Sequence, residues 1–131
     1  MKVLFDTNIF VSALARHGGR AEHALVRIIE GRDALILSKP IILETLSVLS
    51  RKFGKDKQEL ARVAVFLSDI AQLVDPKRKV SILSDEPDNR ILECAFEGKA
   101  SAIVTGDRAI LKLERYEGIQ IVCLSEYLTE Q

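Results

Sequence analysis

The chain has 131 residues, of which 47% are hydrophobic, so it carries enough apolar surface for one sizeable core. Its 19 Lys and Arg balance 19 Asp and Glu. A formal net charge of zero excludes a globally basic nucleic-acid-binding protein but still permits a local basic patch. We expect one domain over residues 1–131.

Short apolar runs predict strands buried on both faces, because they lack the alternation of a half-exposed sheet. The runs cover residues 3–5, 34–37, 102–104 and 119–124. Between them, apolar residues recur at helical spacing; they are Ala24, Leu25, Ile28 and Ile29, then Leu60, Val63, Ala64 and Leu67. Strands that alternate with helices predict an α/β fold, a parallel sheet wrapped by helices.

Two further helices have recognisable ends. A helix over residues 40–53 follows Ser38, a suitable capping residue, and stops at Gly54. Another begins near Pro87, carries apolar side chains at positions 91, 92, 95 and 96, and stops at Gly98.

The cysteines and histidines offer no candidate site. Cys94 and Cys123 stand far apart among aliphatic residues and are expected to be buried, reduced thiols. His17 and His23 flank a Gly-Gly turn and are expected to face water. An acid at position 6 comes too early for a signal peptide, and no window approaches about 18 uninterrupted apolar residues. We therefore expect a soluble, cytoplasmic protein.

Two of the expected strands run directly into an aspartate, Asp6 and Asp107. The carboxyl ends of parallel strands share one edge, which is where ligands bind in open α/β sheets. Asp88 lies in the first turn of its helix, on the apolar face, and a right-handed crossover would bring it to the same edge. Asp85 is one turn earlier and less well placed.

Each acid also has an ordinary structural explanation. Asp6 and Asp107 can cap helices, and Asp88 can interact with a helix dipole. Glu44 shares a helical face with other polar residues, a pattern that favours a solvated stripe. The polar residues of the first helix are expected to bond locally or face water; they are Asn8 and Ser12.

Several carboxylates at one sheet edge would repel one another strongly without a cation. Because no set of His or Cys accompanies them, they favour Mg²⁺ or Mn²⁺ over zinc. One or two such ions, about 3.5–4 Å apart when paired, activate water and hold a scissile phosphate.

Four segments in this order resemble the PIN-domain nucleases, which include the VapC-type toxins of toxin–antitoxin pairs. They are LFDTNIFVSAL, SKPIILETLSVL, SDEPDNRILECA and ASAIVTGDRAIL, and together they extend over nearly the whole chain. The resemblance implies a three-layer fold with a central, mainly parallel sheet of about five strands flanked by helices. It also implies an endoribonuclease whose product carries a 5′-phosphate, a small antitoxin partner and a homodimer.

The resemblance assigns roles by position. The implied Mg²⁺ or Mn²⁺ ligands and catalytic acids are Asp6, Glu44, Asp88 and Asp107, which reverses the interpretation of Glu44. The implied supporting residues are Asn8, Ser12 and Thr105, with Asp85 in the outer shell. Many relatives carry a further acid where this chain has Ala109, so a second metal is expected to be weakly held or recruited only with substrate.

A recessed pocket favours single-stranded or looped RNA, whose scissile phosphate is exposed. The basic residues that either contact phosphates or are plain surface charges are Arg16, Arg20, Arg51, Lys52 and Arg108. One rival is a phosphatase or receiver domain with Asp6 as phosphoryl acceptor, but such phosphatases need a second aspartate where this chain has Asn8. The other is a PIN scaffold that binds RNA or protein without turnover, against which the intact acidic quartet argues.

Overall fold

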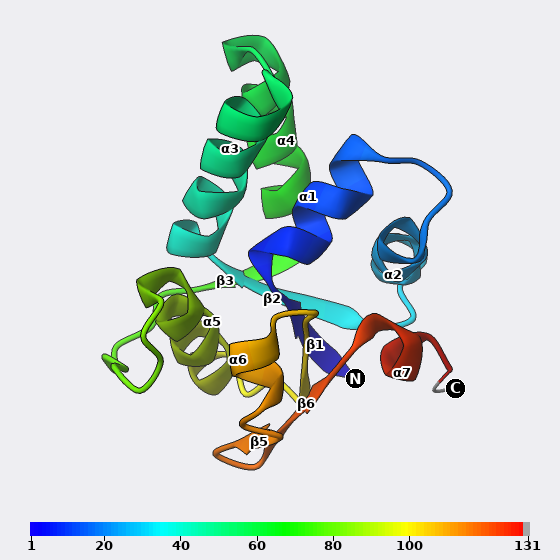
Figure 1. Cartoon of the computed structure of the whole chain (residues 1–131). Coiled ribbons are helices and arrows are strands. Elements are labelled where there is room, and N and C mark those ends of the chain that lie inside the picture. Colours follow the sequence, from blue (N-terminus) through cyan, green and yellow to red (C-terminus); the bar gives the residue numbers. More distant parts are fainter. Residues whose placement is uncertain (130–131) are drawn as a thin grey trace.

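The computed structural model describes residues 1–129 and has an α/β architecture (Figure 1). The strands are β1 (Lys2–Phe5), β2 (Ala34–Ser38), β3 (Ala71–Val74), β4 (Ala102–Val104), β5 (Arg115–Tyr116) and β6 (Ile119–Val122). The helices are α1 (Thr7–Ala15), α2 (Arg20–Ile29), α3 (Lys39–Phe53), α4 (Lys57–Ile70), α5 (Glu86–Glu97), α6 (Arg108–Leu111) and α7 (Leu124–Thr129).

Within residues 1–129 the strands form one sheet in the order β3-β2-β1-β4-β6-β5. All pairs are parallel except β5 with β6. The chain moves outward from β1 through β2 to β3 and then returns to place β4 on the other side of β1. The strand order therefore reverses between β1 and β4, and ligands of open α/β sheets bind beyond the carboxyl ends of such a strand pair.

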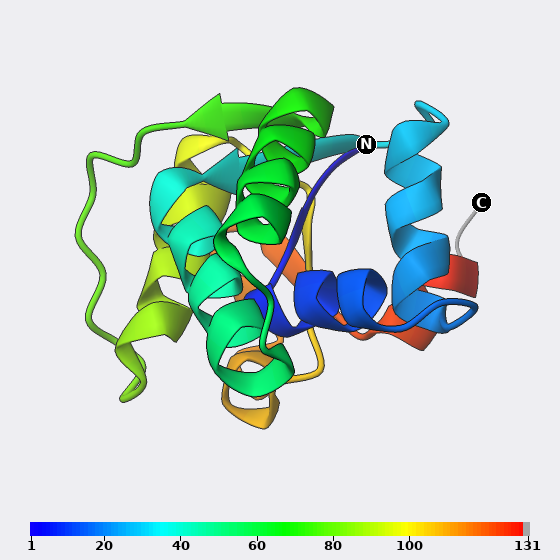
Figure 2. The same ribbon diagram turned by 90° about the horizontal axis from the view of Figure 1, so that it is seen from above.

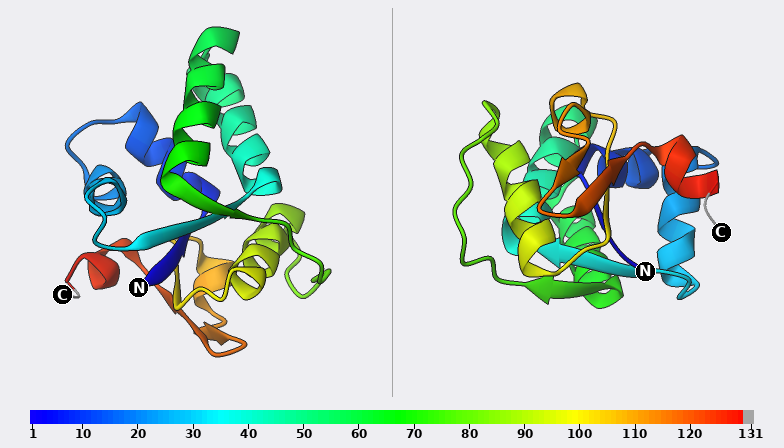
Figure 3. Two further views of the ribbon diagram at one scale, coloured as in Figure 1. Left: turned by 180° about the vertical axis from the view of Figure 1, so that it is seen from behind. Right: turned by 90° about the horizontal axis from the view of Figure 1, so that it is seen from below.

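Helices cover both faces of the sheet, as the predicted three-layer fold requires. Figure 1 shows α1, α3 and α4 on one side and α5 and α6 on the other. Figure 2 shows α3 and α4 packed side by side, and residues 75–85 as a long segment along the outside of α5. The β5–β6 hairpin lies at the end of the molecule remote from α3 and α4 (Figure 3). In residues 1–129, no helix is long and apolar enough to cross a membrane.

The expected strands are confirmed as β1, β2, β4 and β6, which are largely buried. The last apolar run is shorter than predicted, because the strand ends at Val122 and Leu124 begins α7. The sequence pattern missed β3 and β5. Both are edge strands, and an edge strand needs no continuous apolar run because one side lacks a partner.

The helix over residues 40–53 is confirmed as α3, which begins one residue earlier. Gly54 ends it with φ of +63°, a left-handed conformation that suits glycine. Ser38 occupies the N-cap position, but its side chain makes no capping hydrogen bond. The residue types at the two ends therefore predicted where the helix begins and stops, but the capping hydrogen bond expected from Ser38 is absent.

One expectation about burial is wrong. Cys94 is buried as expected, but Cys123 is only partly buried, since it follows the last residue of β6.

Candidate active site

Asp6 and Asp107 follow β1 and β4, which are neighbours in the sheet. The Asp6 N–H donates to the Val104 carbonyl at 3.1 Å and so extends this pairing. Asp6 also caps α1, accepting from the Ile9 N–H at 3.1 Å, and Asp107 caps α6, accepting from the Ile110 N–H at 3.0 Å. Asp6 and Asp107 therefore each cap a helix and also lie at the same edge of the sheet.

Thr105 joins the two aspartates. Its side chain is completely buried, and its hydroxyl donates to the second carboxylate oxygen of Asp6. The same hydroxyl accepts from the Asp107 N–H at 2.9 Å. Thr105 therefore orients the Asp6 carboxylate and the backbone that carries Asp107 with a single oxygen atom.

A hollow of about 190 Å³ lies between the start of α1, one face of α3 and the start of α5. We call it the acidic hollow; it is lined by Asp6, Thr7, Asn8, Glu44, Val48, Arg51, Lys52, Asp85, Pro87, Asp88 and Ile91. This volume is large enough for a phosphate group with several waters of its hydration.

The acids at this edge are close enough to raise one another's pKa. Burial raises the pKa of Asp6 above its ordinary value, although the hydrogen bond from Thr105 lowers it. The pKa of Asp88 rises to about 7, first through burial and then through the negative charges of Asp107, Asp85 and Asp6. Like charges disfavour ionisation in this way only at short range, so the fold brings these acids together.

The sequence of residues 2–109 matches the family described as PIN domain. The chain belongs to the PIN domain family. It is 30% identical over 117 residues to the uncharacterized protein MJ1680 of Methanocaldococcus jannaschii. The aligned region covers 86% of this chain and 75% of that protein.

Two solved structures share the fold of this PIN domain. One is VapBC2 from Rickettsia felis bound to a DNA fragment from their promoter, with a TM-score of 0.65 and 16% identity, covering 94% of this chain and 98% of that chain. The other is VapBC-1 from nontypeable Haemophilus influenzae, with a TM-score of 0.61 and 16% identity, covering 95% and 99%. These structures confirm the predicted PIN-like fold.

The acids predicted for the PIN domain fall in or beside the acidic hollow. Asp6, Asp88 and Glu44 line it, and Glu44 is only partly exposed despite its polar neighbours on α3. Asp85, expected to be poorly placed, lines it as well and occupies the N-cap position of α5. Asp107 adjoins the hollow through its electrostatic contact with Asp88.

The supporting and basic residues divide into two groups. Asn8, Arg51 and Lys52 line the acidic hollow. The predicted residues that are not among its lining are Ser12, Thr105, Arg16, Arg20 and Arg108. Of these, Thr105 still acts on Asp6 directly, whereas the three arginines are exposed side chains at other surface positions. His17 and His23 are exposed, as expected.

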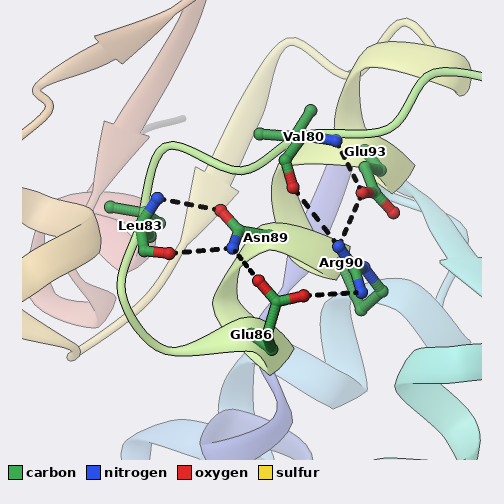
Figure 4. Close-up of polar contacts among 6 residues, drawn as sticks. All are labelled: Val80, Leu83, Glu86, Asn89, Arg90 and Glu93. Atoms are coloured by element: carbon green, nitrogen blue, oxygen red, sulfur yellow. Dashed lines mark hydrogen bonds and ion pairs between the residues drawn. The ribbon is translucent and has the colours of Figure 1, made fainter.

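Sequence reasoning missed Asn89, which is completely buried. Its side-chain oxygen accepts from the Leu83 N–H at 2.9 Å, and its amide nitrogen donates to the Leu83 carbonyl and to Glu86 Oε1, each at 2.9 Å (Figure 4). These bonds hold the chain immediately before Asp85 and the first turn of α5, which carries Asp88. The adjacent acid in the segment DEPDN is the only sequence signal for this role.

Arg90 and Glu93, one turn further along α5, bind the chain that precedes this helix. Arg90 donates to Glu93 Oε2 at 2.8 Å and to the Val80 carbonyl at 3.3 Å, and it pairs with Glu86 at 3.4 Å (Figure 4). The Val80 N–H donates to Glu93 at 2.8 Å. The buried Glu93 carboxylate is therefore both paired and hydrogen-bonded, as a buried charge requires.

The donors around the acidic hollow are hard oxygen atoms of carboxylates and of the Asn8 side chain, the ligand type that Mg²⁺ and Mn²⁺ prefer. Among residues 1–129, however, no group of three or more His, Cys, Asp or Glu side chains is arranged so that it could hold a metal ion. The donor atoms are therefore of the type that a divalent cation binds. To bind one, the acid side chains would have to move closer together.

Proposed function

We propose that this PIN domain is a Mg²⁺- or Mn²⁺-dependent endoribonuclease and the toxin of a toxin–antitoxin pair. The observation that carries the proposal is that acids from three separate segments line one hollow whose wall also bears Arg51 and Lys52. Carboxylates suit a hard cation, and the two basic side chains suit the phosphate oxygens of a nucleic acid.

In this mechanism Asp6, Asp88 and Asp107 would hold the cation, and Glu44 would help to position the cation or the attacking water. The bound cation supplies Lewis-acid activation of water and charge neutralisation at the phosphate. Thr105 keeps the Asp6 carboxylate in one orientation, and Glu44 accepts a hydrogen bond from the attacking water. The water loses a proton to solvent as its oxygen adds to phosphorus, the bond to the 3′ oxygen breaks, and that oxygen takes up a proton from solvent, which leaves a 5′-phosphate on the product.

The proposed substrate is single-stranded or looped RNA. The acidic hollow lies between α1, α3 and α5, and a single strand can bend its backbone to bring a phosphate between these helices more readily than a regular duplex can. Arg51 and Lys52 lie in the last turn of α3 and would contact the phosphates that enter.

Cleavage of a mixed RNA pool tests this function. The wild type is expected to cut RNA with Mg²⁺ or Mn²⁺ and not with EDTA, and Asp6→Asn and Asp107→Asn are expected to lose cleavage. Asp56→Asn is the matched control, because Asp56 caps α4 as Asp6 caps α1 but lies outside the acidic hollow. Persistent cleavage by both folded site variants refutes the assigned site, and a trapped phospho-aspartyl enzyme refutes the nuclease mechanism.

The proposal includes two protein contacts. A small antitoxin would cover the acidic hollow, and it is expected to co-purify with Asp6→Asn and to block cleavage by the wild type.

A homodimer would bury apolar side chains of α3 and α4 such as Leu43 and Val65, which are 54% and 60% exposed. Light scattering after gel filtration would detect the dimer, and Val65→Glu is expected to dissociate it; a monomeric wild type contradicts this part.

A further inference from the structure

A second hollow, of about 180 Å³, adjoins the acidic hollow. The two share three wall residues, Thr7, Glu44 and Pro87. The other residues of the second hollow lie in or near the first turns of α3 and α5; they are Pro40, Ile41, Glu86 and Arg90. We call it the proline hollow. The two hollows form one groove along α3, from Ile41 to Arg51, about 15 Å at ~1.5 Å per residue.

The walls of the proline hollow differ from those of the acidic hollow. Pro40 from α3 and Pro87 from α5 supply rigid rings, and Ile41 adds an aliphatic side chain. Arg51 and Lys52, the basic residues of the acidic hollow, are not among its lining. Flat apolar surfaces of this kind suit the face of a planar ring rather than a hydrated ion.

The polar groups of the proline hollow offer acceptors. Both terminal nitrogens of Arg90 are already engaged by Glu93, Glu86 and a backbone carbonyl (Figure 4), whereas its Nε is buried without a hydrogen-bond partner among the described residues. Glu86 is held in place by Asn89. In residues 1–129, Glu44 makes no hydrogen bond or ion pair. Two carboxylates beside one guanidinium whose terminal nitrogens are engaged repel phosphate and favour a neutral group with N–H donors.

We propose that the proline hollow binds one unstacked nucleobase of the RNA, next to the phosphate that enters the acidic hollow. This inference rests on the ribonuclease activity proposed above. The base lies between Pro40 and Pro87, and its amino group donates to Glu86, as amino groups of bases do to carboxylates in other complexes. Bases with an exocyclic amino group are therefore preferred to uracil. Because Asn89 and Arg90 already hold Glu86, little ordering is needed on binding.

The test uses the full chain and a short RNA whose cleavage position has been mapped. The nucleotides on either side of the cut are replaced one at a time by each base and by an abasic ribose, and kcat/KM is measured for each RNA. At one of the two positions, cytosine, adenine or guanine is expected to exceed uracil and the abasic ribose by about tenfold.

Variants connect this base dependence with the hollow. Pro40→Ala is expected to reduce the ratio between intact and abasic RNA, and Glu86→Gln to reduce the ratio between cytosine and uracil. Ser50→Ala is the matched control, because Ser50 is an exposed residue of α3 that lines neither hollow, and it is expected to retain both ratios. Circular dichroism establishes that each variant is folded.

The outcomes separate the two proposals. Cleavage that is indifferent to the base at both positions overturns the nucleobase site and leaves the ribonuclease function standing. The same indifference is expected if the proline hollow takes a side chain of a protein partner instead. A base dependence that Pro40→Ala and Glu86→Gln leave unchanged also overturns the site, whereas a wild type that cleaves no RNA overturns both proposals.

Discussion

Thr105→Val removes one buried hydroxyl while nearly preserving the shape of the side chain. The hydroxyl donates to Asp6 and accepts from the Asp107 N–H, and both bonds are lost together. Thr105 is completely inaccessible to solvent, so water cannot replace it without rearrangement. A buried polar group left without a partner costs about 1–3 kcal/mol, so we expect the free energy of unfolding to fall by about 2–5 kcal/mol.

Urea unfolding followed by circular dichroism measures this loss. The midpoint is expected to fall by about 1–2 M. Thr45→Val is the control, because Thr45 is equally buried but its hydroxyl bonds to the Ile41 carbonyl of its own helix, at 2.9 Å. That carbonyl is already an acceptor within the helix, so we expect this control to lose less than about 1 kcal/mol.

A Thr105→Val chain as stable as the Thr45→Val chain would refute the argument that one hydroxyl joins the two strand ends. Thr105→Ser retains the oxygen and is expected to recover most of the stability. RNA cleavage provides a second measurement, since an Asp6 carboxylate without its donor is free to reorient. We expect kcat to fall in Thr105→Val and to recover in Thr105→Ser.

Three further predictions concern other parts of the fold. A Cβ at Gly98 would overlap Cγ2 of Ile36, so Gly98→Ala is expected to lower the free energy of unfolding by about 1–3 kcal/mol, and by less when it is made in an Ile36→Ala background. Burial alone would raise the pKa of Asp33, but hydrogen bonds from Tyr127 and the N-terminal amine outweigh it and hold the pKa below its ordinary value. Its stabilisation is therefore present above about pH 4 and lost as the pH falls through the lowered pKa, so Asp33→Asn should be costly in urea unfolding at pH 7 and progressively less so as the pH is lowered below 4. Asn89→Ala leaves two backbone groups without partners and is expected to cost about 2–4 kcal/mol and to speed hydrogen exchange before α5.

Each of these has a result that would contradict it. Gly98→Ala with wild-type stability would mean that Ile36 moves aside without cost. A stability difference for Asp33→Asn that grows below pH 4 would reverse the sign argued from the lowered pKa. Unchanged amide exchange at Leu83 in Asn89→Ala would show that the segment before Asp85 is held by other contacts.

Much of the fold was predictable because its central strands are continuous apolar runs. β1, β2, β4 and β6 are surrounded by other chain on both faces, which leaves a strong composition signal. The edge strands β3 and β5 lack that signal, and pairing with a neighbour decides them instead. Helix ends were predictable at Gly54, where the backbone adopts a conformation that few other residues tolerate.

The candidate site was only partly predictable. Placing Asp6 and Asp107 at one edge needs no more than two parallel strands that end in acids. The side of α3 on which Glu44 lies was ambiguous from spacing, because its polar face is shared between solvent and the acidic hollow. The adjacent acid in DEPDN was the only sequence signal for the role of Asn89, since its principal partner is the backbone of Leu83, which every residue type except proline would provide.

By itself, the sequence determined what depends on neighbours along the chain: strands that run into acids, and the caps that Asp6 and Asp107 form three residues ahead. Only the tertiary structure decided how these acids meet. The bond from Thr105 to Asp6 joins residues 99 positions apart and exists because β1 and β4 pair side by side. Contacts between remote segments depend on strand order and helix packing, which local residue patterns do not specify.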